Sequence, residues 1–256
     1  MNQKNKKWFI LSFILIGLSI SFIKVSAQSS ISLDFDNTGS ASLESLDVVF
    51  LLLFLSIIPS LVLMMTSFTR IIIVFSFLRN ALGLQQSPPN QILVGLSLFL
   101  TLFIMGPVIS DINENAYIPY KEQAITQEVA LDRAQIPIKE FMLRQVDNES
   151  LELFISISKQ EVVIDQSQDV NEQMMELDLS ILVPAFVTSE LKRAFLIGFL
   201  IYIPFLAIDL IVASTLMSMG MVMLPPGMIS LPFKVMVFIL ANGWGLLMSS
   251  LVQGFH

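Results

Sequence analysis

The chain has 256 residues, of which 54% are apolar and only 14% are charged, and its mean hydropathy is +0.76. A soluble domain is about 45–50% apolar and about 25% charged, so this composition predicts a membrane-associated chain rather than a water-soluble enzyme or a disordered protein. Cysteine is absent and the single histidine is His256, which excludes disulfides, thiolate metal sites and most histidine chemistry. A net charge of −7 without a basic patch argues against a nucleic-acid partner.

The charge is concentrated in one part of the sequence. Residues 110–180 hold 15 of the 21 acidic residues and five of the 14 basic ones, a net charge of −10. The rest of the chain has a net charge of +3. This distribution predicts a set of apolar segments interrupted by one acidic, water-exposed domain.

The N-terminus has the pattern of a secretory signal peptide. Three lysines precede an uncharged stretch over residues 8–23, and small residues follow at 25–27. We therefore expect a signal peptide over residues 1–27, cleaved after its last residue. The alternative is an uncleaved short anchor helix. Residues 28–45, rich in Ser, Asp and Asn, are expected to be a flexible lead-in.

The next segment predicts a first apolar helical hairpin over residues 46–110. Helical patterning is continuous over 46–82, about 55 Å of helix at about 1.5 Å per residue. A bilayer core is only about 30 Å thick, so this helix must tilt, extend beyond the membrane, or kink, with Pro59 as the candidate. A glycine and polar turn residues at 83–90 then lead into a second apolar helix over 92–109.

The remaining segments complete an all-α prediction. Residues 111–180 form an acidic segment in which short amphipathic stretches predict helices packed on an apolar surface. Residues 181–256 predict a second apolar hairpin, with helices over 194–217 and 234–252 joined by a loop over 218–232. We find no repeat of fixed period.

Catalytic and nucleotide-binding motifs are missing from the sequence. It contains no P-loop, no dinucleotide-binding glycine pattern and no zinc-protease motif. An intramembrane aspartyl protease needs two acids, and Asp209 has no second acid in the apolar helices. We therefore expect a non-enzyme without cofactor or metal, which draws any energy it needs from partner proteins.

Asp209 is the charged residue that the apolar pattern least explains. An acid in an apolar helix is costly and is usually functional or paired. Lys234, which opens the next helix, is the expected partner of opposite sign in a buried charge pair. The alternatives are that Asp209 separates two apolar segments at an interface, or that it is the coupling acid of a small-solute transporter.

Methionine alternates with other residues at 217, 219, 221 and 223. If this segment is extended, the four side chains lie on one side. Because methionine is flexible and polarisable, four of them at a hairpin corner could form a deformable seal. The alternative is ordinary packing in an apolar core, although Gly220 and the double proline that follows favour a loop.

The basic residues give conflicting signals about topology. Arg70 and Arg79 place the tip of the first hairpin in the cytoplasm by the positive-inside rule. A cleaved signal peptide then places residues 110–180 outside. Lys192 and Arg193 lie on that same outer side and break the rule, so a simple four-span topology does not fit.

Several motifs in a fixed order carry a family resemblance. They are MMTSFTR at 64–70, LRNALGLQQSPPNQ at 78–91, PAFVTSELKRAF at 184–195, IGF at 197–199, PFLAID at 204–209, SLPFK at 230–234 and NGW at 242–244. Together they resemble the FliP family, part of the export gate of the flagellar type III secretion apparatus. The motifs cover about residues 45–110 and 180–254, and the acidic middle is not diagnostic.

The resemblance implies a pentamer that assembles with FliR and FliQ-like proteins, and with other export-apparatus subunits, into a conical export-gate core. Such a core would sit largely above the plane of the bacterial inner membrane, in contact with lipid, in the flagellar basal body. Unfolded flagellar subunits would be its substrates. A location of much of the chain on the periplasmic side would also remove the topology conflict.

The resemblance also implies roles for single residues. The family's methionine-rich loop, a gasket around the export channel, maps to Met221, Val222 and Met223, with Met219 as a further candidate. Where the family often has three consecutive methionines, this chain has Val222, so the seal is expected to differ in shape. The charged residues within the matched motifs are expected to act in assembly and hairpin packing; they are Arg70, Arg79, Glu190 and Lys192.

Two other functions remain open at this point. A virulence injectisome homologue is the sister interpretation, but the signal peptide and the sizeable acidic segment favour the flagellar branch. A polytopic small-solute transporter or channel would be expected to show inverted repeats, which we do not see.

Overall fold

The computed structural model describes residues 43–85, 87–158, 177–221 and 223–255. Within these ranges every regular element is a helix, which confirms the all-α prediction. The expected signal peptide and most of the lead-in lie outside the described residues. The chain divides into units of residues 1–53 and 54–256, and the motifs given above, from residue 64 to residue 244, lie entirely within the second unit.

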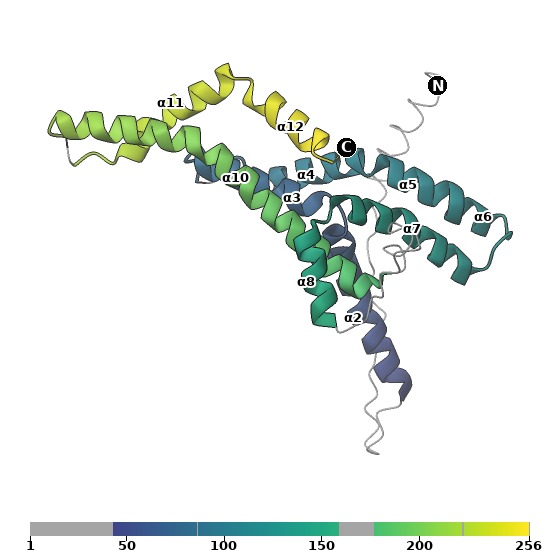
Figure 1. The fold of residues 1–256 in the computed structure, drawn as a ribbon. Coiled ribbons are helices and arrows are strands. Elements are labelled where there is room, and N and C mark those ends of the chain that lie inside the picture. The colour runs from purple at the N-terminus through teal and green to yellow at the C-terminus, as the bar shows by residue number, and fades with distance from the viewer. Residues whose placement is uncertain (1–42, 86, 159–176, 222, 256) are drawn as a thin grey trace, which may run out of the picture. The chain divides into compact units, whose positions relative to one another are not determined.

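Figure 1 shows the helices in chain order from α2 to α12. Their bounds are α2 Leu43–Met64, α3 Phe68–Ala81, α4 Asn90–Ile104, α5 Gly106–Ile112, the π-helix η1 Asn113–Tyr117, α6 Ile118–Lys121, α7 Gln127–Gln145, α8 Asn148–Ser158, α10 Leu179–Ser218, α11 Pro226–Leu240 and α12 Gly243–Gln253.

Of the alternatives expected for residues 46–82, the structure shows a kink, but not at Pro59. The helix breaks after Met64, and the axes on the two sides of the break differ by 72°. Pro59 lies inside α2 and not at the break. At the break the hydroxyl of Thr66 donates to the carbonyl of Leu63 and accepts from the N–H of Phe68. Such a hydroxyl competes with the regular ladder of helical hydrogen bonds.

The second apolar helix also bends, at Met105. There α4 and the run α5–η1–α6 form an angle of 58°, and Pro107 in the first turn of α5 lacks the N–H that would continue the ladder. The run α5–η1–α6 carries the chain into the acidic segment, where it packs against α7. The expected helices of that segment are therefore present as α7 and α8.

The long helix α10 organises the second half of the unit. It has forty residues and packs along α3, α7, α8 and α11. Against α3 the approach is close, because a Cβ added at Gly198 would lie 2.4 Å from the ring of Phe77. The core between these helices contains fully buried apolar side chains; among them are Ile71, Val74, Phe75, Leu182 and Phe186.

The last predicted helix, over 234–252, is two helices. Between α11 and α12 the chain bends by 62°, and Asn242 adopts a left-handed φ of 50°. Trp244 then packs edge-on against Phe238. Within the described ranges, α10 alone is long and apolar enough to cross a membrane, and the number of spans rises to four if each bent pair counts as one.

Candidate functional site

A buried arginine, Arg70 of α3, lies at a junction of three helices and the end of a fourth. It is 2% exposed. Its Nε and Nη2 donate to the two carboxylate oxygens of Glu190 on α10, at 2.7 and 2.5 Å. This two-pronged geometry is the strongest form of an arginine–carboxylate pair. Glu190 is fully buried as well. Because neither charge is solvated by water, each is stabilised mainly by the other.

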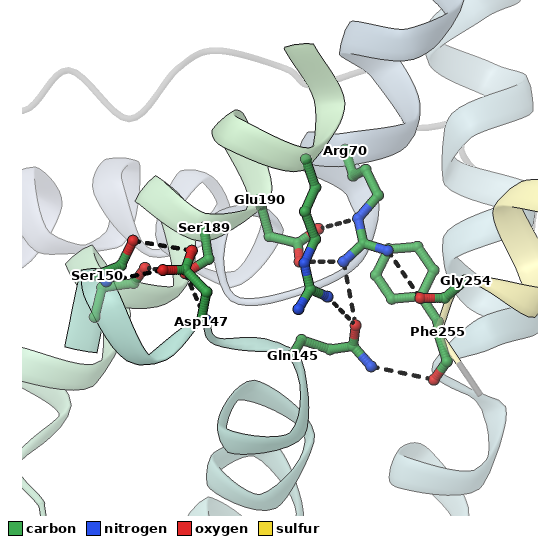
Figure 2. Close-up of polar contacts among 10 residues, drawn as sticks. Arg70, Gln145, Asp147, Ser150, Ser189, Glu190, Gly254 and Phe255 are labelled. Carbon is green, nitrogen blue, oxygen red and sulfur yellow. Dashed lines mark hydrogen bonds and ion pairs between the residues drawn. The ribbon is translucent and has the colours of Figure 1, made fainter. Parts of the chain in front are cut away.

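Three further groups complete this Arg70 cluster, which we define as Arg70, Gln145, Glu190, Gly254 and Phe255 (Figure 2). Arg70 donates to Oε1 of Gln145 on α7 at 3.1 Å and to the carbonyl of Gly254 at 3.0 Å. Gln145 donates in turn to the carbonyl of Phe255 at 3.2 Å. The guanidinium carbon lies 3.7 Å from the centre of the Phe255 ring. The cluster therefore joins α3, α7 and α10 to the segment after α12.

A more exposed polar group lies beside the Arg70 cluster, where α7 ends and α8 begins. The carboxylate of Asp147 accepts from the N–H of Ser150, as a helix N-cap does. Burial raises the pKa of Asp147. Hydrogen bonds from Ser150 and Ser189 and the charge of Lys192 together lower it by more than burial raises it, so the pKa of Asp147 lies below its ordinary value. Lys192 itself is exposed and forms an ion pair with Glu149 at 2.5 Å.

Asp209 and Lys234, the pair expected from the sequence, lie side by side. Nζ of Lys234 is 2.6 Å from Oδ2 of Asp209 and also donates to the carbonyl of Ala81 at 3.1 Å. The hydroxyl of Ser230 donates to the other carboxylate oxygen of Asp209 at 2.5 Å. The Lys234 side chain is 6% exposed and that of Asp209 32% exposed. This Asp209 cluster, Asp209 with Ser230 and Lys234, ties α10, α11 and the end of α3 together.

The methionine corner, residues 217–221 and 223, joins α10 to α11, and Val222 lies outside the described residues. The segment is not extended, because Gly220 has a φ of 74° and caps α10. The N–H of Met221 donates to the carbonyl of Leu216 and that of Gly220 to Met217, the paired bonds of a Schellman motif. The side chains are nonetheless exposed: 62% for Met217, 67% for Met219, 39% for Met221 and 97% for Met223.

Arg79 is the other arginine of α3, and its surroundings differ from those of Arg70. It donates to Oδ1 of Asn90 at 2.5 Å and to the carbonyl of Pro88 at 3.4 Å. Its Nε is buried and has no hydrogen-bond partner among the residues that the structure describes. None of the ion pairs among the described residues involves it.

The sequence named four charged residues for assembly, and the structure sorts them into different environments. Arg70 and Glu190 were named separately, and their direct pairing was missed. Gln145 and Phe255 were missed altogether, because a neutral side chain gives no charge signal in an apolar chain. Among the described residues no group of three His, Asp or Glu side chains is arranged to hold a metal.

Comparison with known proteins identifies the family. The profile of the FliP family matches residues 51–251. The flagellar biosynthetic protein FliP of Pectobacterium carotovorum is 48% identical over 95% of this chain and 92% of its own length. The proteins of that name from Aquifex aeolicus and Bacillus subtilis are 48% and 47% identical, over 83% and 91% of this chain and 87% and 99% of their own lengths. The chain belongs to the FliP family.

FliP membership makes the chain a membrane-associated component of the flagellar export apparatus, which works with other proteins of that apparatus. The flagellar names of these relatives favour this role over that of an injectisome homologue. The family match includes Arg70, Glu190, Asp209 and the methionine corner, and it ends at residue 251, before the Gly254–Phe255 part of the Arg70 cluster.

Proposed function

We propose that this chain is a core channel subunit of the flagellar export gate, through which unfolded flagellar subunits cross the inner membrane. Identical copies form a pentameric ring with FliQ- and FliR-like proteins, and the methionine corner of each copy closes the pore at rest. The chain has a structural role and performs no catalysis of its own.

The observation that carries this proposal is the exposure of the methionine corner. Met223, at 97% exposed, contacts almost nothing within its own chain. A large apolar side chain held at the surface by a capped helix end is typical of an interaction site. In a ring, each methionine recurs around the axis, so thioethers from all copies can fill one central hole. Soft side chains can part around a passing chain and close again behind it.

The apolar helices around the corner support an assembled state. The exposed large side chains of α10 include Phe195, Phe199 and Leu210 at 57–64%, and those of α11 include Met228 and Leu240 at 72% and 78%. Such surfaces require cover by lipid or by other subunits. A ring of copies with small partner proteins supplies that cover.

An engineered cysteine at the corner tests the ring directly, because the chain has no native cysteine. In a ring, a residue meets its own counterparts within disulfide distance only near the axis. Met223→Cys should therefore give disulfide-linked dimers in the assembled complex, whose intact mass should contain five copies of the chain. Leu153→Cys, 49% exposed on α8, is the off-axis control. An assembled ring without Met223 dimers would contradict the proposal.

We also place the acidic segment on the periplasmic side, because its net charge of −10 needs water. Glu128→Cys should react with an impermeant thiol reagent once the outer membrane is opened. Gln85→Cys, at the opposite end of the first hairpin, should react only after the inner membrane is opened. The reverse pattern would contradict this orientation.

A further inference from the structure

A polar cleft of about 680 Å³ opens where α3 ends and α4 begins. Its walls come from three parts of the chain: the end of α3 with the turn after it, the middle of α10, and the start of α11. The polar side chains that line it are Asn80, Gln85, Ser87, Tyr202, Asp209 and Lys234. Such a cleft is unusual in a chain whose exposed helix faces are mostly apolar.

The polar groups of the cleft are only partly satisfied within the chain. No hydrogen bond joins the side chain of Asn80, Gln85, Ser87 or Tyr202 to another described residue, so all four are free to bind a ligand. The buried Lys234 faces inward, and the more exposed carboxylate of Asp209 lines the opening. A carboxylate can accept about four hydrogen bonds, and that of Asp209 accepts two. The opening therefore favours hydrogen-bond donors.

Arg79 directly precedes Asn80, a residue of the cleft wall, and it lacks a counter-ion. Its acceptors, Asn90 Oδ1 and the carbonyl of Pro88, are neutral, and no described residue accepts a hydrogen bond from its buried Nε. The carbonyl end of α3 attracts the guanidinium, but that attraction is a fraction of a full charge. A partly buried cation is stabilised far more by a carboxylate. The corner thus holds a cation without a paired acid, beside a cleft in which the carboxylate of Asp209 can accept further hydrogen bonds.

A second copy of the chain is a poor source of that acid, because we place its acidic segment on the periplasmic side, away from this corner at the opposite end of the first hairpin. Outside the acidic segment, Glu190 and Asp209 are the acidic side chains that the structure describes. Glu190 is fully buried against Arg70, and Asp209 already pairs with Lys234. A phosphate group would satisfy Arg79, but it brings only acceptors to the carboxylate of Asp209. A peptide segment supplies both a carboxylate and N–H donors.

We propose that the α3–α4 corner, residues 79–85 and 87–90 with the cleft beside it, binds a polar segment of another subunit of the export apparatus. An acidic side chain of that segment pairs with Arg79, and its N–H groups donate to Asp209 and to the free amide oxygens of the cleft. This inference rests on the proposed function, since it takes the partner from the same assembly.

Charge reversal at the corner tests the pairing. Complexes purified from cells that carry Arg79→Glu, Arg79→Lys or the control Arg133→Glu, an exposed cation of α7, are compared by the amount of each co-purified subunit per copy of this chain. Arg79→Glu should lower one partner by about tenfold or more, because truncating a desolvated charge pair raises dissociation strongly. Arg79→Lys should lower it less, and Arg133→Glu should change nothing.

Two outcomes of this comparison would overturn the inference. Retention of every partner by Arg79→Glu would show that no acid binds the corner. Loss of the ring itself, with the Met223 cysteine dimers gone from the same sample, would place Arg79 between copies. The intact mass and the cysteine dimers test the proposed ring, and the amount of co-purified partner tests binding at the α3–α4 corner. Because both are measured, a wrong ring proposal is distinguishable from a wrong corner proposal.

A photo-reactive residue at Gln85 avoids any loss of folding. In the otherwise unchanged complex it should cross-link to one export-apparatus subunit, at a peptide that contains an acidic residue and that mass spectrometry identifies. Cross-linking to a second copy, to lipid, or to nothing would each contradict the proposal.

Discussion

The Arg70 cluster and the methionine corner show two opposite solutions within one chain. In the Arg70 cluster a buried charge has its acceptors supplied by α7, α10 and the segment after α12. At the methionine corner two hydrogen bonds cap the end of α10, but the methionine side chains are exposed. The first region satisfies its charges within one copy, whereas under the proposed function the second is covered by other copies. Substitutions in the two regions should therefore fail in different ways.

The largest effect is expected at the Arg70 cluster. Arg70→Ala or Glu190→Ala leaves one buried charge without its partner, which should lower the free energy of unfolding by about 3–5 kcal/mol. Thermal unfolding of the purified protein in detergent measures this. The double variant Arg70→Met with Glu190→Met should lose less than either alanine variant, because no charge is then stranded. Single losses below about 1 kcal/mol would show that the cluster does not hold the junction.

A smaller and asymmetric effect is expected at the Asp209 cluster. Asp209→Ala leaves the buried ammonium of Lys234 with one carbonyl and should cost about 3 kcal/mol, whereas Lys234→Ala leaves a carboxylate that water already reaches and should cost about 1 kcal/mol. Both should impair assembly or export. In a double-mutant cycle the two losses should not add. Additive losses would show that the two residues do not stabilise each other.

The smallest effect is expected at Asp147, as a pH dependence. Its pKa is lower in the folded chain than in the unfolded chain. The carboxylate therefore stabilises the fold above the unfolded pKa of about 3.9, and this stabilisation disappears as the pH falls through the folded value. Because the carboxylate remains partly accessible to water, Asp147→Asn should cost about 0.5 kcal/mol at neutral pH. Unfolding of the two proteins from pH 7 to pH 2 should converge, and a gap that persists at pH 2 would contradict this origin.

The contrast between the two regions also explains what the sequence could predict. Asp209 and Lys234 could be paired in advance because Lys234 opens the predicted helix that follows the one carrying Asp209, across a single hairpin turn. Arg70 and Glu190 lie 120 residues apart, and no local pattern connects them. Gln145 carries no charge, so its place in the cluster depends entirely on how α7 packs.

Backbone breaks were predicted less well than helices. The apolar pattern continues across residues 64–68, where neither glycine nor proline marks the break that Thr66 makes. The alternation of methionines would place their side chains on one side only in an extended segment, but one left-handed glycine, Gly220, makes the same residues a helix cap. In both places a single hydrogen-bonding or conformational detail outweighs the periodicity of side chains.

The central claim is that exposed methionines at the corner seal the pore of an assembled ring. The variant with Met219, Met221 and Met223 all changed to Ala tests it most directly, with Met236→Ala, 51% exposed on α11, as the control. A hydrophobic constriction excludes water and ions by dewetting, so the triple variant should assemble normally, let ions leak across the inner membrane and still export flagellar subunits. The control should stay tight. A triple variant that assembles and remains as ion-tight as the unmodified ring would contradict the account.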